Sequence, residues 1–146
     1  PQVAYLDKDT AVAFRDDGFS IYIGKQIPKE AANVKVKQEI VSTFYDENNI
    51  GLVFKSNGDS KYTMKVYNTS GKKKFERSFS IPYTNIRMSN GQVVMNNSSQ
   101  VCVITDQGAV RYNGTIDEGT INDFFKVGYN RYMLILDTGI DLLKFT

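Results

Sequence analysis

Three consecutive lysines form the most basic stretch of the sequence. Lys72, Lys73 and Lys74 follow the turn-like residues Asn-Thr-Ser-Gly at 68–71. A basic run of this kind can bind phosphate groups or an anionic polymer. No aromatic residue alternates with the lysines to stack on bases, and Glu76 follows closely. We therefore interpret the run as solvated turn residues that also keep an outer strand from pairing with a neighbouring molecule.

Acidic residues gather at two turn-like stretches, Asp7 with Asp9 and Asp16 with Asp17. Calcium loops need several oxygen ligands at fixed spacing and end in a bidentate acid, and neither stretch has that register. Asx turns, in which the carboxylate binds nearby backbone, explain both stretches. A glycoside hydrolase would need a matched pair of carboxylates. The spacing selects no such pair among the remaining candidates, which are Glu30, Glu39, Asp46, Glu47, Asp117, Glu118 and Asp123.

The sequence contains no histidine. This excludes Ser-His-Asp and Cys-His arrangements and any His-ligated zinc site within these residues. Cys102 is the only cysteine, so no internal disulfide can form, and the run Val101–Ile104 predicts that it is buried as a small hydrophobe. We predict no catalytic residue, no metal ligand, no cofactor-binding residue and no cofactor for this chain.

Tyrosine is the remaining candidate for recognition, because Tyr-rich surfaces can bind glycans or proteins. Tyrosine is also an ordinary strand residue, so the signal is weak. Tyr83 and Tyr129 lie near turns and are the best candidates for exposed rings. The nine tyrosines are Tyr5, Tyr22, Tyr45, Tyr62, Tyr67, Tyr83, Tyr112, Tyr129 and Tyr132.

The composition is that of an ordinary globular protein. The chain has 146 residues, of which 41% are hydrophobic and 23% charged, and this suits one domain or one compact fragment. The formal net charge of +2 is too balanced for a dedicated nucleic-acid binder, so we predict no nucleic-acid partner. The apolar stretches are too short to span a bilayer. Because the sequence begins at Pro1 without an initiator Met, we expect any membrane anchor to lie outside this chain.

Short strand-like runs separated by turn signals fill the sequence. Asn-Gly and Asp-Gly pairs between such runs are strong signals for hairpins. One stretch, Pro28–Asn33, has a helical composition, and we predict a turn or a single helical turn there. The predicted strands are Val3–Leu6, Ala11–Phe14, Phe19–Ile23, Ile40–Tyr45, Ile50–Phe54, Tyr62–Tyr67, Lys74–Phe79, Asn85–Met88, Gln92–Met95, Val101–Thr105, Val110–Gly114, Ile121–Val127, Arg131–Leu136 and Ile140–Phe145.

The strands group into repeats. The first strands of the groups begin at Val3, Ile40, Asn85 and Ile121, so the intervals are 37, 45 and 36 residues. A period near forty with four strands per unit is typical of β-propeller blades. A β-sandwich or a barrel of similar length is the alternative.

We predict an all-β fold of about four antiparallel, four-stranded β-propeller blades in a single domain or fragment. The blades are placed at residues 1–38, 39–81, 82–119 and 120–146. The last group has only three strands, and four blades is the low end for closed propellers. We therefore expect part of a larger propeller, with an exposed inter-blade face that makes the chain a homo-oligomer by burying itself against another copy.

Several segments resemble a known family. Ile40–Ser80, with its inner run Met64–Lys73, resembles one of the later blades of an uncharacterised, clostridial-type (Firmicutes) family that has a quinoprotein-like or WD40-like propeller. Val101–Gly114 resembles the next blade, and Arg131–Phe145 resembles the closing segment. The resemblance implies a bacterial protein with one N-terminal transmembrane anchor and a propeller on the extracellular face. It implies no known activity and supplies no catalytic residue.

These observations favour a protein that is not an enzyme. We expect an extracytoplasmic interaction or scaffolding module whose partner is a protein or a cell-surface polymer. One alternative is a module that binds or senses cell-wall glycans. Another is part of a propeller enzyme whose active site lies outside these residues.

Overall fold

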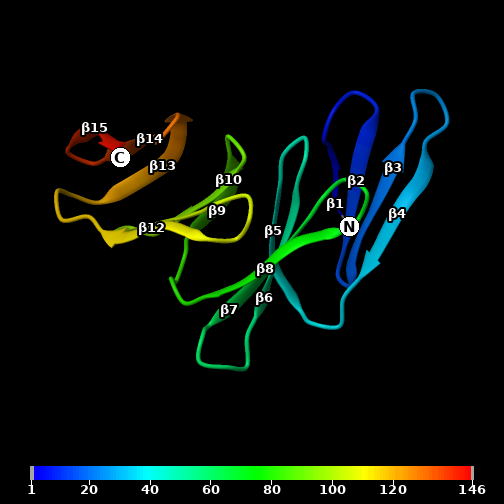
Figure 1. Ribbon diagram of the computed structural model, residues 1–146, viewed down its shortest axis with the longest axis horizontal. Helices are drawn as coiled ribbons and strands as arrows, with labels where there is room; N and C mark the ends of the chain where they lie inside the picture. The colour runs from blue at the N-terminus through cyan, green and yellow to red at the C-terminus, as the bar shows by residue number, and fades with distance from the viewer. Residues whose placement is uncertain (1, 146) are drawn as a thin grey trace. The chain divides into compact units, whose positions relative to one another are not determined.

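The computed structural model describes residues 2–145, which fold almost entirely into antiparallel β-strands (Figure 1). The strands form four sheets, and in each sheet neighbours in sequence are neighbours in space. The chain divides into two compact units, one ending at Ser80 and the other beginning at Ile81. Each unit holds two of the sheets.

The first sheet is a meander of β1 (Gln2–Tyr5), β2 (Thr10–Arg15), β3 (Gly18–Ile23) and β4 (Lys29–Lys35). The β2–β3 turn is tight, with Arg15 directly opposite Gly18. The glycine has φ +147°, a conformation that side chains other than glycine rarely adopt, so this turn fixes the register of the sheet.

The prediction of a turn or helical turn at Pro28–Asn33 is wrong, because β4 begins at Lys29. The strand pairs with β3 through Ala32 opposite Ile21 and Val34 opposite Phe19. Its pairing satisfies the outer edge of β3, and Ala32 and Val34 pack against the core. A stretch this short gains little from helix propensity alone, so sheet pairing decides its structure.

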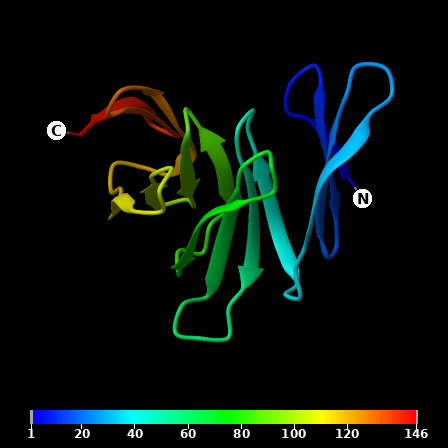
Figure 2. The ribbon, with the colours of Figure 1, turned by 45° about the vertical axis from the view of Figure 1, so that its right-hand side comes forward.

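The second sheet is again a four-stranded meander, shown in green and cyan in Figure 2. Its strands are β5 (Ile40–Tyr45), β6 (Ile50–Lys55), β7 (Tyr62–Tyr67) and β8 (Lys73–Phe79). β6 is apolar on both sides and almost fully buried, as expected for a strand covered on both faces.

The third sheet contains β9 (Asn85–Ser89), β10 (Gln92–Asn96), β11 (Gln100–Ile104) and β12 (Val110–Thr115). Asn90 and Gly91 both have positive φ in the β9–β10 turn, which is the Asn-Gly hairpin expected from the sequence.

The fourth sheet has only three strands among the described residues: β13 (Ile121–Gly128), β14 (Arg131–Leu136) and β15 (Gly139–Lys144). Its β14–β15 turn repeats the turn of the first sheet, because Leu136 lies opposite Gly139 and this glycine also has φ +147°. β15 therefore corresponds to β3, and no described strand takes the place of β4.

The three four-stranded sheets share one irregularity. The register between the third and fourth strands shifts at Ile21/Tyr22 in the first sheet, at Val66/Tyr67 in the second and at Val103/Ile104 in the third. An extra residue in the outer strand produces such a bulge and increases its local twist. The same bulge near the same end of each sheet shows that the sheets are repeats of one unit.

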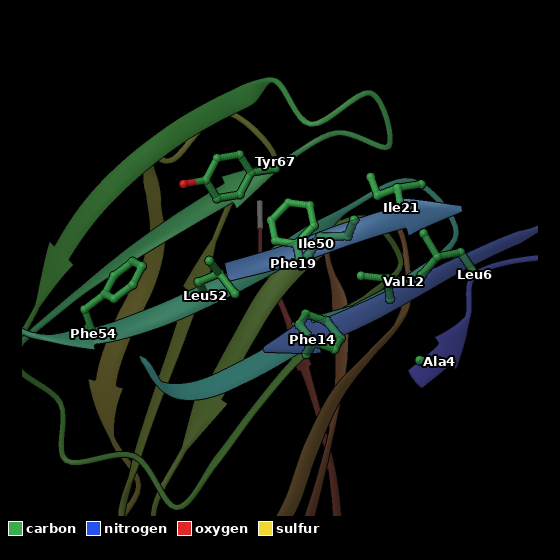
Figure 3. Packing of buried hydrophobic residues seen from close by; sticks show 10 residues of the cluster. All are labelled: Ala4, Leu6, Val12, Phe14, Phe19, Ile21, Ile50, Leu52, Phe54 and Tyr67. Atoms are coloured by element: carbon green, nitrogen blue, oxygen red, sulfur yellow. The ribbon is translucent and has the colours of Figure 1, made fainter. Parts of the chain in front are cut away.

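The core of the first unit lies between its two sheets. Figure 3 shows Phe14, Phe19 and Ile21 of the first sheet in one cluster with residues of β6 and β7. The Phe19 and Tyr67 rings meet edge to face, with centroids 5.2 Å apart. Each large side chain buried here contributes about 1.5–3 kcal/mol by removing apolar surface from water.

The second unit has its own core. Phe124, Tyr132 and Leu134 of the fourth sheet pack with Val101 and Val103 of the third. The Phe124 and Tyr132 rings are stacked with centroids 5.6 Å apart. The strand residues of this cluster come from one face of the third sheet and one face of the fourth, so these two sheets pack on each other.

Candidate functional site

The lysine run is held within the second sheet. Lys73 Nζ lies 3.0 Å from Glu76 Oε1, and Lys74 Nζ donates to Asn49 Oδ1 at 2.6 Å. Asn68 closes the turn before the run by accepting hydrogen bonds from the backbone of Ser70 and Lys72. Two of the three ammonium groups thus have partners inside the sheet, which supports the interpretation as turn and edge residues.

A pair of substitutions in this run tests that interpretation. Lys74→Met keeps the aliphatic stem but leaves the amide oxygen of buried Asn49 without its donor. We expect a loss of about 1–2 kcal/mol in the free energy of unfolding, measured by urea denaturation. Lys72→Met removes the same charge from an exposed turn and should change stability by less than about 0.5 kcal/mol. Equal effects from the two substitutions would contradict a structural role for Lys74.

The acidic candidates mainly order turns. Asp7 Oδ1 accepts from Asp9 N at 2.8 Å, and this backbone hydrogen bond is the main reason why the pKa of Asp7 lies below its usual value. Asp46 Oδ1 accepts from the backbone of Asn48 and from the side chain of Asn49. Among residues 2–145, no three Asp, Glu or Cys side chains lie close enough together to hold a metal ion.

The remaining carboxylates are spread over separate parts of the fold. Glu30 lies in β4, Glu39 precedes β5, and Glu47 lies in the β5–β6 turn. Asp117 and Glu118 lie between β12 and β13. Asp123 in β13 forms an ion pair with Arg87, whose guanidinium also donates to the Phe124 carbonyl. The structure therefore gives these six acids and Asp46 no common site.

The tyrosines divide into buried and exposed groups. Tyr132 is fully buried, donates its hydroxyl hydrogen to Gln92 Oε1, and has its pKa raised mainly by burial. Tyr129 is 84% exposed, as predicted, whereas Tyr83 is half-buried. Tyr5 is 76% exposed, and the sequence did not single it out.

Burial of Tyr132 predicts a loss of stability at alkaline pH. The pKa is raised above 10.0 in the folded protein, so its contribution is complete below pH 10 and is lost as the pH rises through the folded pKa. The unfolding midpoint in urea should therefore fall on the alkaline side, and Tyr132→Phe should flatten this dependence. Tyr129→Phe, at an exposed site, should leave it as in the wild type. A slope that both substitutions leave unchanged would contradict the prediction.

The free face of the first sheet, on the side opposite its core, exposes a group of apolar side chains, next to the polar residues Glu30 and Asn33 that β4 contributes to the same face. We call it the Tyr5 face and define it as Val3, Tyr5, Ala11, Ala13 and Tyr22. Val3 is 61% exposed. An antiparallel sheet with one face in water normally carries polar residues there, so a group of exposed apolar side chains on that face indicates a surface that a partner covers.

A hollow of about 210 Å³ lies on the Tyr5 face. Its walls are mostly apolar, and Lys8 and Asp9 stand at its edge. Pro28 closes another side. Tyr5 and Tyr22 therefore present ring surface and a hydroxyl group next to a small apolar depression, an arrangement suited to recognition of a partner.

A larger hollow of about 370 Å³ in the same unit is less suited to binding. It lies beside the β2–β3 turn and β5, and Arg15 supplies a charge to its wall. The Arg15 guanidinium is already bonded to Asp17, Ser20 and Asn33. The N–H groups of Arg15 therefore already donate hydrogen bonds within the first sheet and its β2–β3 turn, which makes Arg15 a poor ligand-binding group.

The Tyr5 face corresponds to a covered face of the second sheet. The first hairpin of each sheet is closed by a backbone hydrogen bond, from Leu6 N to Thr10 O in the first sheet and from Asp46 N to Asn49 O in the second. Aligning these two hydrogen bonds shows which residues of the two sheets hold equivalent positions. A row of directly paired residues crosses the first three strands of each sheet. In the first sheet the row is Tyr5, Ala11 and Tyr22, and in the second it is Tyr45, Ile50 and Tyr67.

The next row on the same side extends this match. It contains Val3, Ala13 and Ser20 in the first sheet, and Thr43, Leu52 and Lys65 in the second. Ile50 and Leu52 are fully buried, because through them the second sheet packs on the first. The Tyr5 face is therefore equivalent to the face of the second sheet that packs on the first sheet.

Comparison with protein families matches residues 1–145 to a family of unknown function, DUF5711. The chain belongs to the DUF5711 family. The resemblance seen in the sequence is thus confirmed at the level of a family whose function is unknown and whose match covers nearly the whole chain. No curated protein matches the DUF5711 chain significantly.

Solved β-propellers are similar in structure to the DUF5711 chain. The WD40 β-propeller domain of Doa1 has 12% identity and a TM-score of 0.63, over 97% of this chain and 50% of that one. BamB from Moraxella catarrhalis has 12% identity and a TM-score of 0.58, over 98% of this chain and 42% of that one. HIRA(644-1017) has 9% identity and a TM-score of 0.66, over 97% of this chain and 51% of that one.

At these identities the likeness concerns the fold alone. The predicted all-β fold of antiparallel propeller blades is confirmed, in preference to the β-sandwich or barrel alternative. The DUF5711 chain spans about half the length of the propeller chains that it matches. Within residues 2–145, no helix is long and apolar enough to cross a membrane.

Proposed function

We propose that the DUF5711 chain is a non-catalytic interaction module that holds a partner against the Tyr5 face. The observation that carries the proposal is the exposure of this apolar face, with Tyr5 76% exposed beside a hollow of about 210 Å³. Tyrosine is enriched at protein interfaces because its ring buries a large area while its hydroxyl group still forms hydrogen bonds. Ala11 and Ala13 leave room between the rings for side chains of the partner.

The proposal includes a location. The module works outside the cytoplasm and is tethered to a bacterial membrane by a segment outside residues 1–146. The support is the resemblance of Ile40–Ser80 and Arg131–Phe145 to a membrane-anchored family. A membrane-impermeant label applied to intact cells should modify the domain in the protein as the cell makes it. Modification only after the cells are permeabilised would contradict this location.

Site-specific crosslinking tests the binding surface. A photoreactive phenylalanine analogue at position 5 should give a discrete crosslinked adduct in cells, and mass spectrometry of the adduct identifies the partner. The matched control carries the analogue at Gln107, an exposed residue of the β11–β12 turn. Adducts of equal yield from both positions, or none from position 5, would exclude the Tyr5 face as the binding surface.

Binding of a cell-wall glycan is the second candidate. Tyr5 and Tyr22 line the hollow together, and tyrosine rings beside a shallow depression can stack on sugars. A pull-down with purified cell wall should then retain the wild-type chain but not a Tyr5→Ser/Tyr22→Ser variant. Retention no greater than that of an unrelated control protein would reject the glycan alternative.

A further inference from the structure

The fourth sheet also has an apolar free face. Alternation along β14 and β15 places Met133, Ile135, Ile140 and Leu142 on the side opposite the core of the second unit. Ile140 is 71% exposed and Leu142 is 41% exposed, and the other two side chains are half-buried. We call these four residues the Ile140 face. A solvated sheet surface would normally be polar at such positions.

The Ile140 face corresponds to the covered face of the first sheet. The two turns with Gly18 and Gly139, both at φ +147°, set the register between the sheets. In that register Ile140 takes the position of Phe19, and Leu142 takes the position of Ile21. Met133 and Ile135 likewise match Val12 and Phe14. In the first sheet all four positions are buried, because the second sheet covers them.

The Tyr5 face and the Ile140 face are therefore equivalent to the two faces that pack together inside the first unit. There, the face bearing Phe14, Phe19 and Ile21 packs on the face bearing Ile50, Leu52 and Tyr67. The Ile140 face matches the first of these surfaces, and the Tyr5 face matches the second. Ala11 and Ala13 stand where the second sheet has Ile50 and Leu52, so the Tyr5 face has room for the bulky aliphatic residues of the Ile140 face.

From this correspondence we infer that the partner of the Tyr5 face is the Ile140 face of a second copy of the chain. The inference rests on the proposed function and names the partner for the same surface. Because the two faces differ, the contact is head-to-tail rather than symmetric. The chain spans about half the length of the propeller chains that it matches, and two copies together would match that length.

Sedimentation of the purified 146-residue chain tests the inference. The wild type should associate in the micromolar range. Ala11→Arg places an unpaired charge in the hollow, and Ile140→Asp places one on the other face. Each should weaken self-association by on the order of 100-fold, because a buried unpaired charge costs several kcal/mol. Gln107→Arg carries the same charge change as Ala11→Arg on an exposed turn and should associate like the wild type.

A mixing experiment separates the head-to-tail contact from symmetric ones. The Ala11→Arg chain keeps its Ile140 face, and the Ile140→Asp chain keeps its Tyr5 face. Each variant alone should be monomeric, and an equimolar mixture should form a one-to-one complex. Thermal melting confirms that both variants are folded, as expected for substitutions on exposed faces.

Three outcomes would overturn the inference: a monomeric wild type over the whole range, unchanged association of the Ile140→Asp chain, or a mixture that stays monomeric. A crosslink from position 5 to a different protein, with a monomeric purified chain, would also overturn it while leaving the proposed function intact. Failure of the crosslink at position 5 together with intact self-association of the Ala11→Arg chain would instead reject the Tyr5 face itself.

Discussion

Gly18→Ala should destabilise the first unit by about 3–5 kcal/mol, which approaches the upper range for a single substitution. Gly18 has φ +147°, where an alanine is strained. A Cβ atom at this position would also lie 1.8 Å from the carbonyl oxygen of Val34 in β4. The obstructing atom belongs to the backbone and cannot turn aside as a side chain could, so β4 would have to separate from β3. Urea denaturation of the purified chain measures the loss.

Gly139→Ala is the matched control. Gly139 has the same φ of +147° at the same place in the β14–β15 turn, but nothing lies within 4 Å of the Cβ position. The cost should therefore be the backbone strain alone, about 1–2 kcal/mol. The difference between the two substitutions measures the close approach of β4. Equal losses would mean that strain accounts for both and that the contact with Val34 contributes nothing.

The sequence predicts most of the strands because its turns carry strong local signals. Asn90-Gly91 has positive φ at both residues, as an Asn-Gly hairpin requires. The prediction of three strands in the last group agrees with residues 2–145, in which β15 follows directly from the tight turn at Asp137 and Thr138. Where a turn residue dictates the backbone, local sequence is enough to place both neighbouring strands.

The β4 strand could not be predicted in this way. Lys29-Glu30-Ala31-Ala32 has no alternating apolar pattern and no β-branched residue. Its strand structure comes from the open edge of β3, so the information lies in the residues of β3 rather than in its own.

The candidate site was harder to predict than the fold. Tyr83 was singled out for its nearness to a turn, yet it is half-buried, whereas Tyr5 in the middle of a strand-like run is exposed. A signal was available: Val3, Ala4, Tyr5 and Leu6 are apolar on both sides of the strand, which indicates that both faces are covered. Which face lacks a cover within this chain depends on the neighbouring sheets, and a single strand does not contain that information.

The second large prediction uses two residues that hold the same position in equivalent sheets. Phe19 is fully buried, with its ring 6.4 Å from Phe14 and 5.2 Å from Tyr67 between centroids. Phe19→Ala removes this ring from a closely packed core and leaves a cavity, so the free energy of unfolding should fall by about 3–5 kcal/mol. Chemical denaturation monitored by tyrosine fluorescence is a suitable measurement.

Ile140→Ala tests the same position where no sheet covers it. Ile140 is 71% exposed, so its truncation should change the stability of the dilute, monomeric chain by less than about 0.5 kcal/mol. At concentrations where the wild type associates, the same substitution should lower the apparent stability, because a contact between copies stabilises only the folded chain. We expect the loss of stability to depend on protein concentration for Ile140→Ala and to be independent of it for Phe19→Ala. This difference would show that the surface packed against each residue, and not its position in the sheet, determines how much stability is lost. An equal loss at every concentration would instead mean that Ile140 contributes to the second unit alone and that its face has no partner in a second copy.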